Sequence, residues 1–236
     1  MGNEAIDWRD ALFLKREFLA PYLLLLLIFV ISATTLILAP RDSKTFLSLT
    51  TSDSNYLGAA TGIFLDLNLS AYIGELIWFL MVIVFLIATC LFCNTEQRRR
   101  RAWFFVICSF FIGVIGAEVW VILPHSTPYA LGQSLVSFAA FGIVLGFAFT
   151  NLFSLRKQLK SIKTSFEFIL VLCSPVVLGV MLYEVIFATN AFFIVASGVD
   201  YIGHIAVFIS GLAAWSGFWL TRYVFAKIQS PADKSA

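Results

Sequence analysis

The chain has 236 residues, of which 60% are hydrophobic and only 13% are charged, and its mean hydropathy is +0.92. Soluble domains carry about one quarter charged residues, so this composition excludes a water-soluble globular protein and indicates an integral membrane protein. The formal net charge of +2 gives no sign of a nucleic-acid partner, and none is predicted.

Six apolar runs are long enough, at about 20 residues each, to cross the hydrocarbon of a bilayer as helices. Lipid offers the backbone no hydrogen-bond partner, and no run alternates like a barrel strand, so an all-α bundle is the predicted architecture. The chain then divides into an amphipathic segment at the membrane surface (1–16), a six-helix membrane domain (17–226) and a tail (227–236). The predicted spans are 17–39, 71–92, 102–123, 131–153, 166–187 and 202–225.

Basic residues gather on one side of this topology. All Lys and Arg except Arg41 and Lys44 fall in the N-terminal segment, in the connections after the second and fourth spans, or near the C-terminus. Cytoplasmic loops carry such an excess, so both termini are predicted to be cytoplasmic, in a multi-pass protein of the plasma membrane. The four consecutive arginines at 98–101 are interpreted as an anchor of this topology and not as a nucleic-acid patch.

The connections carry two further signals. The first outer connection, at about 40–70, is the longest, and its apolar middle predicts a loop that is half embedded. Cys90 and Cys93 have the spacing of a thiol-redox pair or of half a zinc site. Because there is no second pair or nearby His, they are interpreted as core or lipid-facing cysteines, and no metal site is predicted.

Five polar residues from five spans share one predicted depth, in the outer third of the bilayer. A charge in hydrocarbon costs at least about 2.5 kcal/mol, and such groups are retained where they face each other or water. The shared depth predicts one cavity open to the outside, and the alternative is that each side chain near a helix end reaches independently to the interface. The five residues are Glu75, Glu118, Ser134, Glu184 and His204.

Ser134 and His204 together have the chemistry of a nucleophile and its base, since a neutral imidazole can take the hydroxyl proton during attack on a carbonyl. Singly, a membrane Ser usually bonds to its own helix, and a lone His is usually a satisfied hydrogen-bond partner. The pair requires the fourth and sixth spans to pack closely. Small residues on both spans allow this, among them Gly142 and Gly146 on the fourth and Gly203, Ser210 and Gly211 on the sixth.

These residues resemble the rhomboid intramembrane serine proteases. The family pattern G-x-S-G in the fourth span, with Tyr and then Gly at four-residue steps, corresponds here to Gly132, Gln133, Ser134, Leu135, Phe138 and Gly142. In the sixth span the family has A/G-H-x-x-G-x-x-x-G, and here Gly203, His204 and Gly211 match while Val207 replaces the first glycine. The likeness extends from about residue 61 to 219, in the family's order.

The resemblance implies a Ser134 nucleophile and a His204 general base, which cleave single-pass transmembrane proteins near their outer end within the bilayer, without a cofactor or metal. It implies supporting roles at the oxyanion for Gly132, Gln133 and Glu75, an aromatic face at Phe138 for the imidazole, and close helix packing at Gly142, Gly203 and Gly211. The fifth span and the loop after it are the expected gate. Four departures stand out: Ala71 and Glu75 replace the His and Asn that help to hold the family's oxyanion, and Leu135 and Val207 add bulk that is expected to push Ser134 and His204 apart.

Two other functions stay open. A rhomboid-like pseudoprotease, which binds transmembrane helices without cutting them, is favoured by the missing oxyanion residues. A small transporter or proton relay built on Glu75, Glu118 and Glu184 is less favoured, because no acid lies at mid-bilayer and no pair of spans is interrupted in matching positions.

Overall fold

The computed structural model describes residues 16–38, 51–52, 56–65, 69–90, 93–122, 129–130, 134–152, 175–176, 178–180, 182–183 and 201–228. Within these ranges, five helices are long and apolar enough to cross a membrane. The fold is therefore that of an all-α multi-pass membrane protein, as predicted. The five helices are α2 (Arg16–Leu38), α5 (Leu69–Cys90), α6 (Thr95–Ile122), α7 (Ser134–Leu152) and α10 (Tyr201–Ile228).

The helix bounds differ from the predicted spans in an informative way. Helices α2 and α5 agree to within two residues, whereas α6 begins at Thr95, seven residues before the predicted start of the third span. Helix α7 is described from Ser134 onward, and residues 131–133, where the fourth span was predicted to begin, lie outside the described residues. Helix α10 continues to Ile228, into the predicted tail. The N-terminal segment 1–15 and the rest of the tail lie outside the described residues, so the sides on which the termini lie stay predictions.

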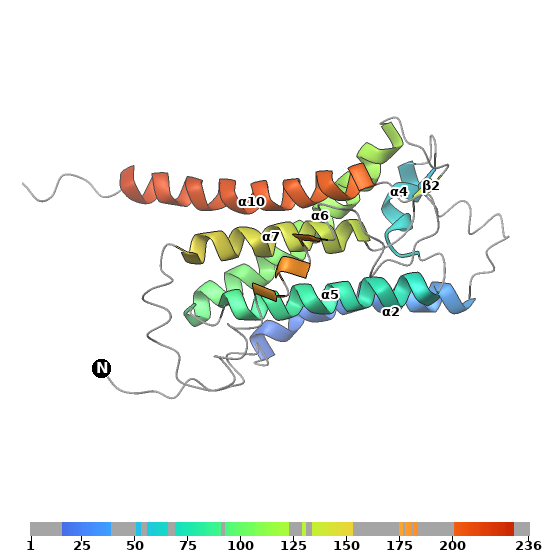
Figure 1. Cartoon of the computed structure of the whole chain (residues 1–236), viewed down its shortest axis with the longest axis horizontal. Coiled ribbons are helices and arrows are strands. Elements are labelled where there is room, and N and C mark those ends of the chain that lie inside the picture. The colour runs from blue at the N-terminus through green and yellow to red at the C-terminus, as the bar shows by residue number, and fades with distance from the viewer. Residues whose placement is uncertain are drawn as a thin grey trace, which may run out of the picture.

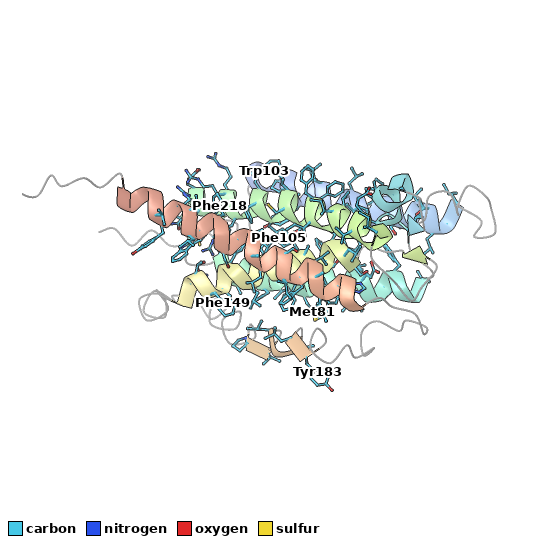
Figure 2. All side chains as sticks on the ribbon, turned by 90° about the horizontal axis from the view of Figure 1, so that it is seen from above. Met81, Trp103, Phe105, Phe149, Tyr183 and Phe218 are labelled. Atoms are coloured by element: carbon cyan, nitrogen blue, oxygen red, sulfur yellow. The ribbon has the colours of Figure 1, made fainter. Side chains whose placement is uncertain are left out.

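Within the predicted fifth span, the described residues are 175–176, 178–180 and 182–183, and all of them are helical. Leu178 and Leu182 pack against the core. Figure 2 shows these pieces on the face of the bundle opposite α2, with Tyr183 pointing away from it, and the Tyr183 side chain is exposed. The remainder of this span, and the loop that was expected to act as a gate, lie outside the described residues.

Helix α7 is the centre of the bundle, with α5, α6 and α10 packed around it (Figure 1). Of the apolar stretch of α7 that is long enough to cross a membrane, 78% is buried inside the protein, compared with 17% of the corresponding stretch of α10. Large side chains fill the space around it, including Trp78, Phe105, Phe141 and Phe147, each fully buried. Helices α2 and α10 in turn expose many apolar side chains, as helices that face lipid do.

The first outer connection folds onto one end of this bundle. It contains β1 (Thr51–Ser52) and α4 (Tyr56–Gly62), and β1 pairs antiparallel with β2 (Tyr129–Ala130), just before α7. Ile63 and Leu65 are each only 1% exposed, so the apolar middle of the loop is covered by protein. Figure 1 shows α4 and β2 at the end of the bundle where α6 ends and α10 begins.

At the other end, the arginine run is part of α6 and is not a simple solvated anchor. Arg99 and Arg100 are exposed and pair with Glu96, but Arg98 and Arg101 are buried. The two buried guanidinium groups find internal partners, and the interpretation of the run as an anchor of the topology stays a prediction.

Arg101 ties four helices together. Its Nη1 donates to the carbonyl of Thr89 at the end of α5 (2.9 Å), and its Nη2 donates to Asn151 Oδ1 at the end of α7 (3.0 Å). The guanidinium carbon also lies over the rings of Phe147 on α7 and Trp215 on α10, at 5.1 and 5.7 Å from their centroids. Buried charges persist when they are hydrogen-bonded and paired with such partners.

Candidate functional site

Ser134 and His204 meet at the end of the bundle where α7 and α10 begin. The Nε2 atom of His204 lies 2.8 Å from Ser134 Oγ, which is a hydrogen-bond distance. Ser134 is 7% exposed and His204 is half-buried. The serine therefore contacts the sixth predicted span and does not merely bond back to its own helix, as an isolated membrane serine usually does.

Glycines bring the two helices into backbone contact. A Cβ atom at Gly142 of α7 would lie 2.1 Å from the Phe208 carbonyl oxygen of α10, and a Cβ atom at Gly211 of α10 would lie 2.2 Å from the Ala139 carbonyl oxygen of α7. Neither position can hold a larger residue without moving a helix. Small residues at these two positions are therefore what lets the two helices approach so closely.

The bulk at Leu135 and Val207 does not separate Ser134 from His204, so that expectation is wrong. Val207 is buried against α6, where a Cβ atom at Gly116 would lie 2.2 Å from Val207 Cγ1. Gly113 makes the same kind of space for Val136 of α7. In the family pattern, a glycine on the sixth span leaves space for its neighbouring helix. Here the glycines of α6 leave space for Val207 and Val136. Leu135 is half-buried and packs at the edge of the core.

A line of aromatic rings supports the imidazole. The ring centroid of Phe138 is 4.7 Å from that of His204, with an angle of 52° between the rings. Behind it, Trp78 of α5 stacks on Phe138 at 5.0 Å and 17°. The Phe138 ring therefore lies tilted beside the imidazole, and its role at the site stays a prediction. Trp78 was missed from the sequence, although it lies three residues after Glu75, on the same helix face.

Glu75 is buried inside the bundle and is only 5% exposed, so it does not reach out to the interface from lipid. It precedes Trp78 by one turn on α5, on the face of that helix that packs against α7. Glu118 of α6 is half-buried near the same end. The single cavity that was predicted to join all these groups stays a prediction.

Other predicted site residues have mixed outcomes. Gly203 is half-buried beside His204 in the first turn of α10. Gly132, Gln133 and Glu184 lie outside the described residues. Among the residues that the structure describes, no three His, Cys, Asp or Glu side chains lie close enough together to hold a metal ion.

The arrangement places a hydroxyl of α7 against an imidazole nitrogen of α10. A hydroxyl and a base within hydrogen-bond distance are two of the parts that an acyl-transfer reaction needs.

No protein-family model, curated protein or solved structure matches this chain. The resemblance to rhomboid proteases therefore rests on the sequence motifs alone.

Proposed function

We propose that this protein is a rhomboid-like intramembrane serine endopeptidase with Ser134 as nucleophile and His204 as general base. The observation that carries the proposal is the 2.8 Å contact between Ser134 Oγ and His204 Nε2, made by residues 70 positions apart in sequence. The pairing matches the one that the motif resemblance implied.

In the proposed reaction, Ser134 donates its proton to the unprotonated Nε2 of His204 as Oγ attacks the carbonyl carbon of a peptide bond. The imidazolium then gives that proton to the departing amine, which leaves an acyl ester on Ser134. Water attacks the ester with His204 again as base, and the second product is released. Phe138 and Trp78 hold the plane of the imidazole so that Nε2 stays aimed at Oγ.

The oxyanion requires donors that differ from those of the family, because Ala71 and Glu75 replace the usual His and Asn. The backbone N–H of Ser134 is one candidate donor. Gly132 and Gln133, directly before it, are further candidates by position in the chain. Glu75 assists only when its carboxyl group is protonated, since a carboxylate would oppose the developing negative charge.

The substrate in this proposal is a single-pass transmembrane protein cleaved near its outer end. A helix shields its own carbonyl groups by hydrogen bonding, so the substrate must unwind locally before a carbonyl reaches Ser134. The finer features of the proposed fold are a fifth span over 166–187, which brings the number of spans to six, cytoplasmic termini and a plasma-membrane location. They are supported by the apolar run and by the distribution of basic residues.

The test is cleavage of a model single-pass substrate by purified protein in liposomes. We expect Ser134→Ala and His204→Ala each to abolish cleavage, because each removes one partner of the proton transfer. Ser137→Ala is the matched control, since Ser137 is also buried on α7 but lies one turn further along. Cleavage that survives in both dyad variants would exclude the assignment.

A pseudoprotease that binds transmembrane helices is the second candidate, favoured by the buried Glu75 in place of the family's amide. A fluorophosphonate probe separates the two functions, because the probe reacts with an activated serine. Labelling of the wild-type protein that is lost in Ser134→Ala supports the protease. An unlabelled wild-type protein that still crosslinks to a transmembrane helix supports the pseudoprotease.

A further inference from the structure

The end of the bundle opposite the dyad contains two thiols at a single turn. Cys90 is the last residue of α5, and Cys93 lies two residues before α6. The Cys93 N–H donates to the Cys90 carbonyl oxygen at 3.0 Å, which closes a four-residue turn. Such a turn keeps its first and last Cα atoms within about 7 Å, the range in which a disulfide can form. In this structure both cysteines are free thiols.

Cys93 also lies just before a capped helix end. Asn94 caps α6, since its Oδ1 accepts from the Gln97 N–H at 2.9 Å while the Gln97 side chain accepts from the Asn94 N–H at 3.2 Å. Helix α6 has 28 residues, and the partial positive charge at its first turn favours a thiolate over a thiol at Cys93.

Two buried arginines add positive charge around the thiols. Arg98 Nε donates to the Cys90 carbonyl oxygen at 3.1 Å, and Arg101 Nη1 donates to the carbonyl of the adjacent Thr89. The Cys93 Sγ atom lies 3.9 Å from that same Thr89 oxygen. The thiol pair therefore lies within the hydrogen-bond network that joins α5 to α6.

This setting favours the charged form of Cys93. The hydrogen bond from Cys90 lowers the pKa of the Cys93 thiol to about 7, and the charges of Arg101 and Arg98 act in the same direction while burial opposes them. A thiol with a pKa near the ambient pH is close to the optimum for attack on a disulfide. Cys93 retains 9% exposure, whereas Cys90 is fully buried, so Cys93 is the member that an incoming reagent reaches first.

From the turn, the helix cap and the two arginines, we infer that Cys90 and Cys93 form a reversible dithiol–disulfide centre that exchanges with low-molecular-weight disulfides. The Cys93 thiolate attacks a disulfide such as oxidised glutathione, forming a mixed disulfide and releasing one glutathione thiolate. Cys90, whose proton passes to the released glutathione thiolate, attacks the Cys93 sulfur and displaces the second glutathione. The two protein thiols are oxidised to one disulfide, and one glutathione disulfide is reduced to two thiols. This inference does not depend on the proposed protease activity.

The first experiment counts free thiols in the full-length protein after equilibration in glutathione buffers of increasing oxidation. After acid quenching and denaturation, a polyethylene-glycol maleimide adds one gel shift for each thiol. The sequence has four cysteines, so we expect four shifts under reducing conditions and two under oxidising conditions. Cys108→Ser is the matched control and should go from three shifts to one. The Cys93→Ser variant should show three shifts under both conditions, and any thiol that it loses should be lost to a glutathione adduct.

The second experiment measures how fast Cys93 is alkylated in the folded protein as a function of pH, with Cys108 and Cys173 replaced by Ser. We expect a midpoint near pH 7, in contrast with about 8.5 for an ordinary cysteine, and a higher midpoint in Arg98→Gln. This readout needs no Cys93 variant, so it holds even if Cys93→Ser does not fold. Four shifts at every glutathione ratio, or loss of thiols only to glutathione adducts in the wild type, would overturn the inference, as would alkylation that begins only above pH 8.

Discussion

Replacing Gly142 with Ala tests whether the crossing of α7 and α10 sets the geometry of the dyad. The added Cβ atom would lie 2.1 Å from the Phe208 carbonyl oxygen and 2.9 Å from the Leu212 nitrogen, both of them backbone atoms of α10. A Cβ atom essentially never lies within 3.0 Å of such an atom, so the helices must separate by at least about 0.9 Å.

The magnitude of the effect on the site follows from this shift. Gly142 lies eight residues after Ser134, about 12 Å along α7, so the site is two turns from the added methyl group. A rigid separation by 0.9 Å would lengthen the 2.8 Å contact between Ser134 and His204 to about 3.7 Å, beyond hydrogen-bond range. Misplacement of reacting groups by about 1 Å costs on the order of 100-fold in rate, and overpacking costs about 1–3 kcal/mol in stability.

The assay is kcat/KM for a model transmembrane substrate in liposomes, with fluorophosphonate labelling and thermal unfolding measured on the same samples. Gly217→Ala on α10 is the matched control, because a Cβ atom there would have nothing within 4 Å. We expect Gly142→Ala to lose about two orders of magnitude and Gly217→Ala to stay near wild type. A folded Gly142→Ala protein as active as Gly217→Ala would refute the reasoning.

Two further predictions concern the supports of the bundle. Arg101→Ala leaves the Thr89 carbonyl and Asn151 without a charged donor and should lower the free energy of unfolding by about 3 kcal/mol in denaturant titrations, whereas Arg99→Ala, in an exposed pair, should stay near wild type. An equal loss in both variants would contradict a buried role for Arg101. Phe138→Leu removes the ring between Trp78 and His204 and should lower kcat about tenfold with little change in KM, whereas Phe138→Tyr should retain activity. A kcat for Phe138→Leu equal to that of wild type would show that the ring does not position the imidazole.

The helices could be predicted from sequence because a span needs about 20 apolar residues and little else. The start of α6 was missed for a physical reason. Four consecutive arginines indicate a solvated connection, but Arg98 and Arg101 are satisfied by carbonyl groups at the end of α5 and by Asn151 on α7. Those partners come from other segments of the chain, so the local sequence cannot show that a buried arginine there will find hydrogen-bond acceptors.

The dyad could be predicted because depth alone brings its two members to one level of the bilayer, and glycines on both helices permit contact. Its support could not be predicted in the same way. Whether Trp78 lies behind Phe138 depends on how α5 is rotated about its axis, and a uniformly apolar helix gives no sequence signal for that rotation.

Val207 shows why a departure from a family motif need not displace a site. In the motif, a glycine at this position lets the fourth and sixth spans approach, and a valine there was expected to hold them apart. The contact between α7 and α10 depends instead on Gly142 and Gly211, whose neighbours across the interface are backbone carbonyl groups. Val207 faces a third helix, where Gly116 leaves space for it. The distance between Ser134 and His204 therefore depends on the glycines whose neighbours are backbone atoms of the other helix. The effect of a substitution at one motif position can be judged only when the helix that it faces is known.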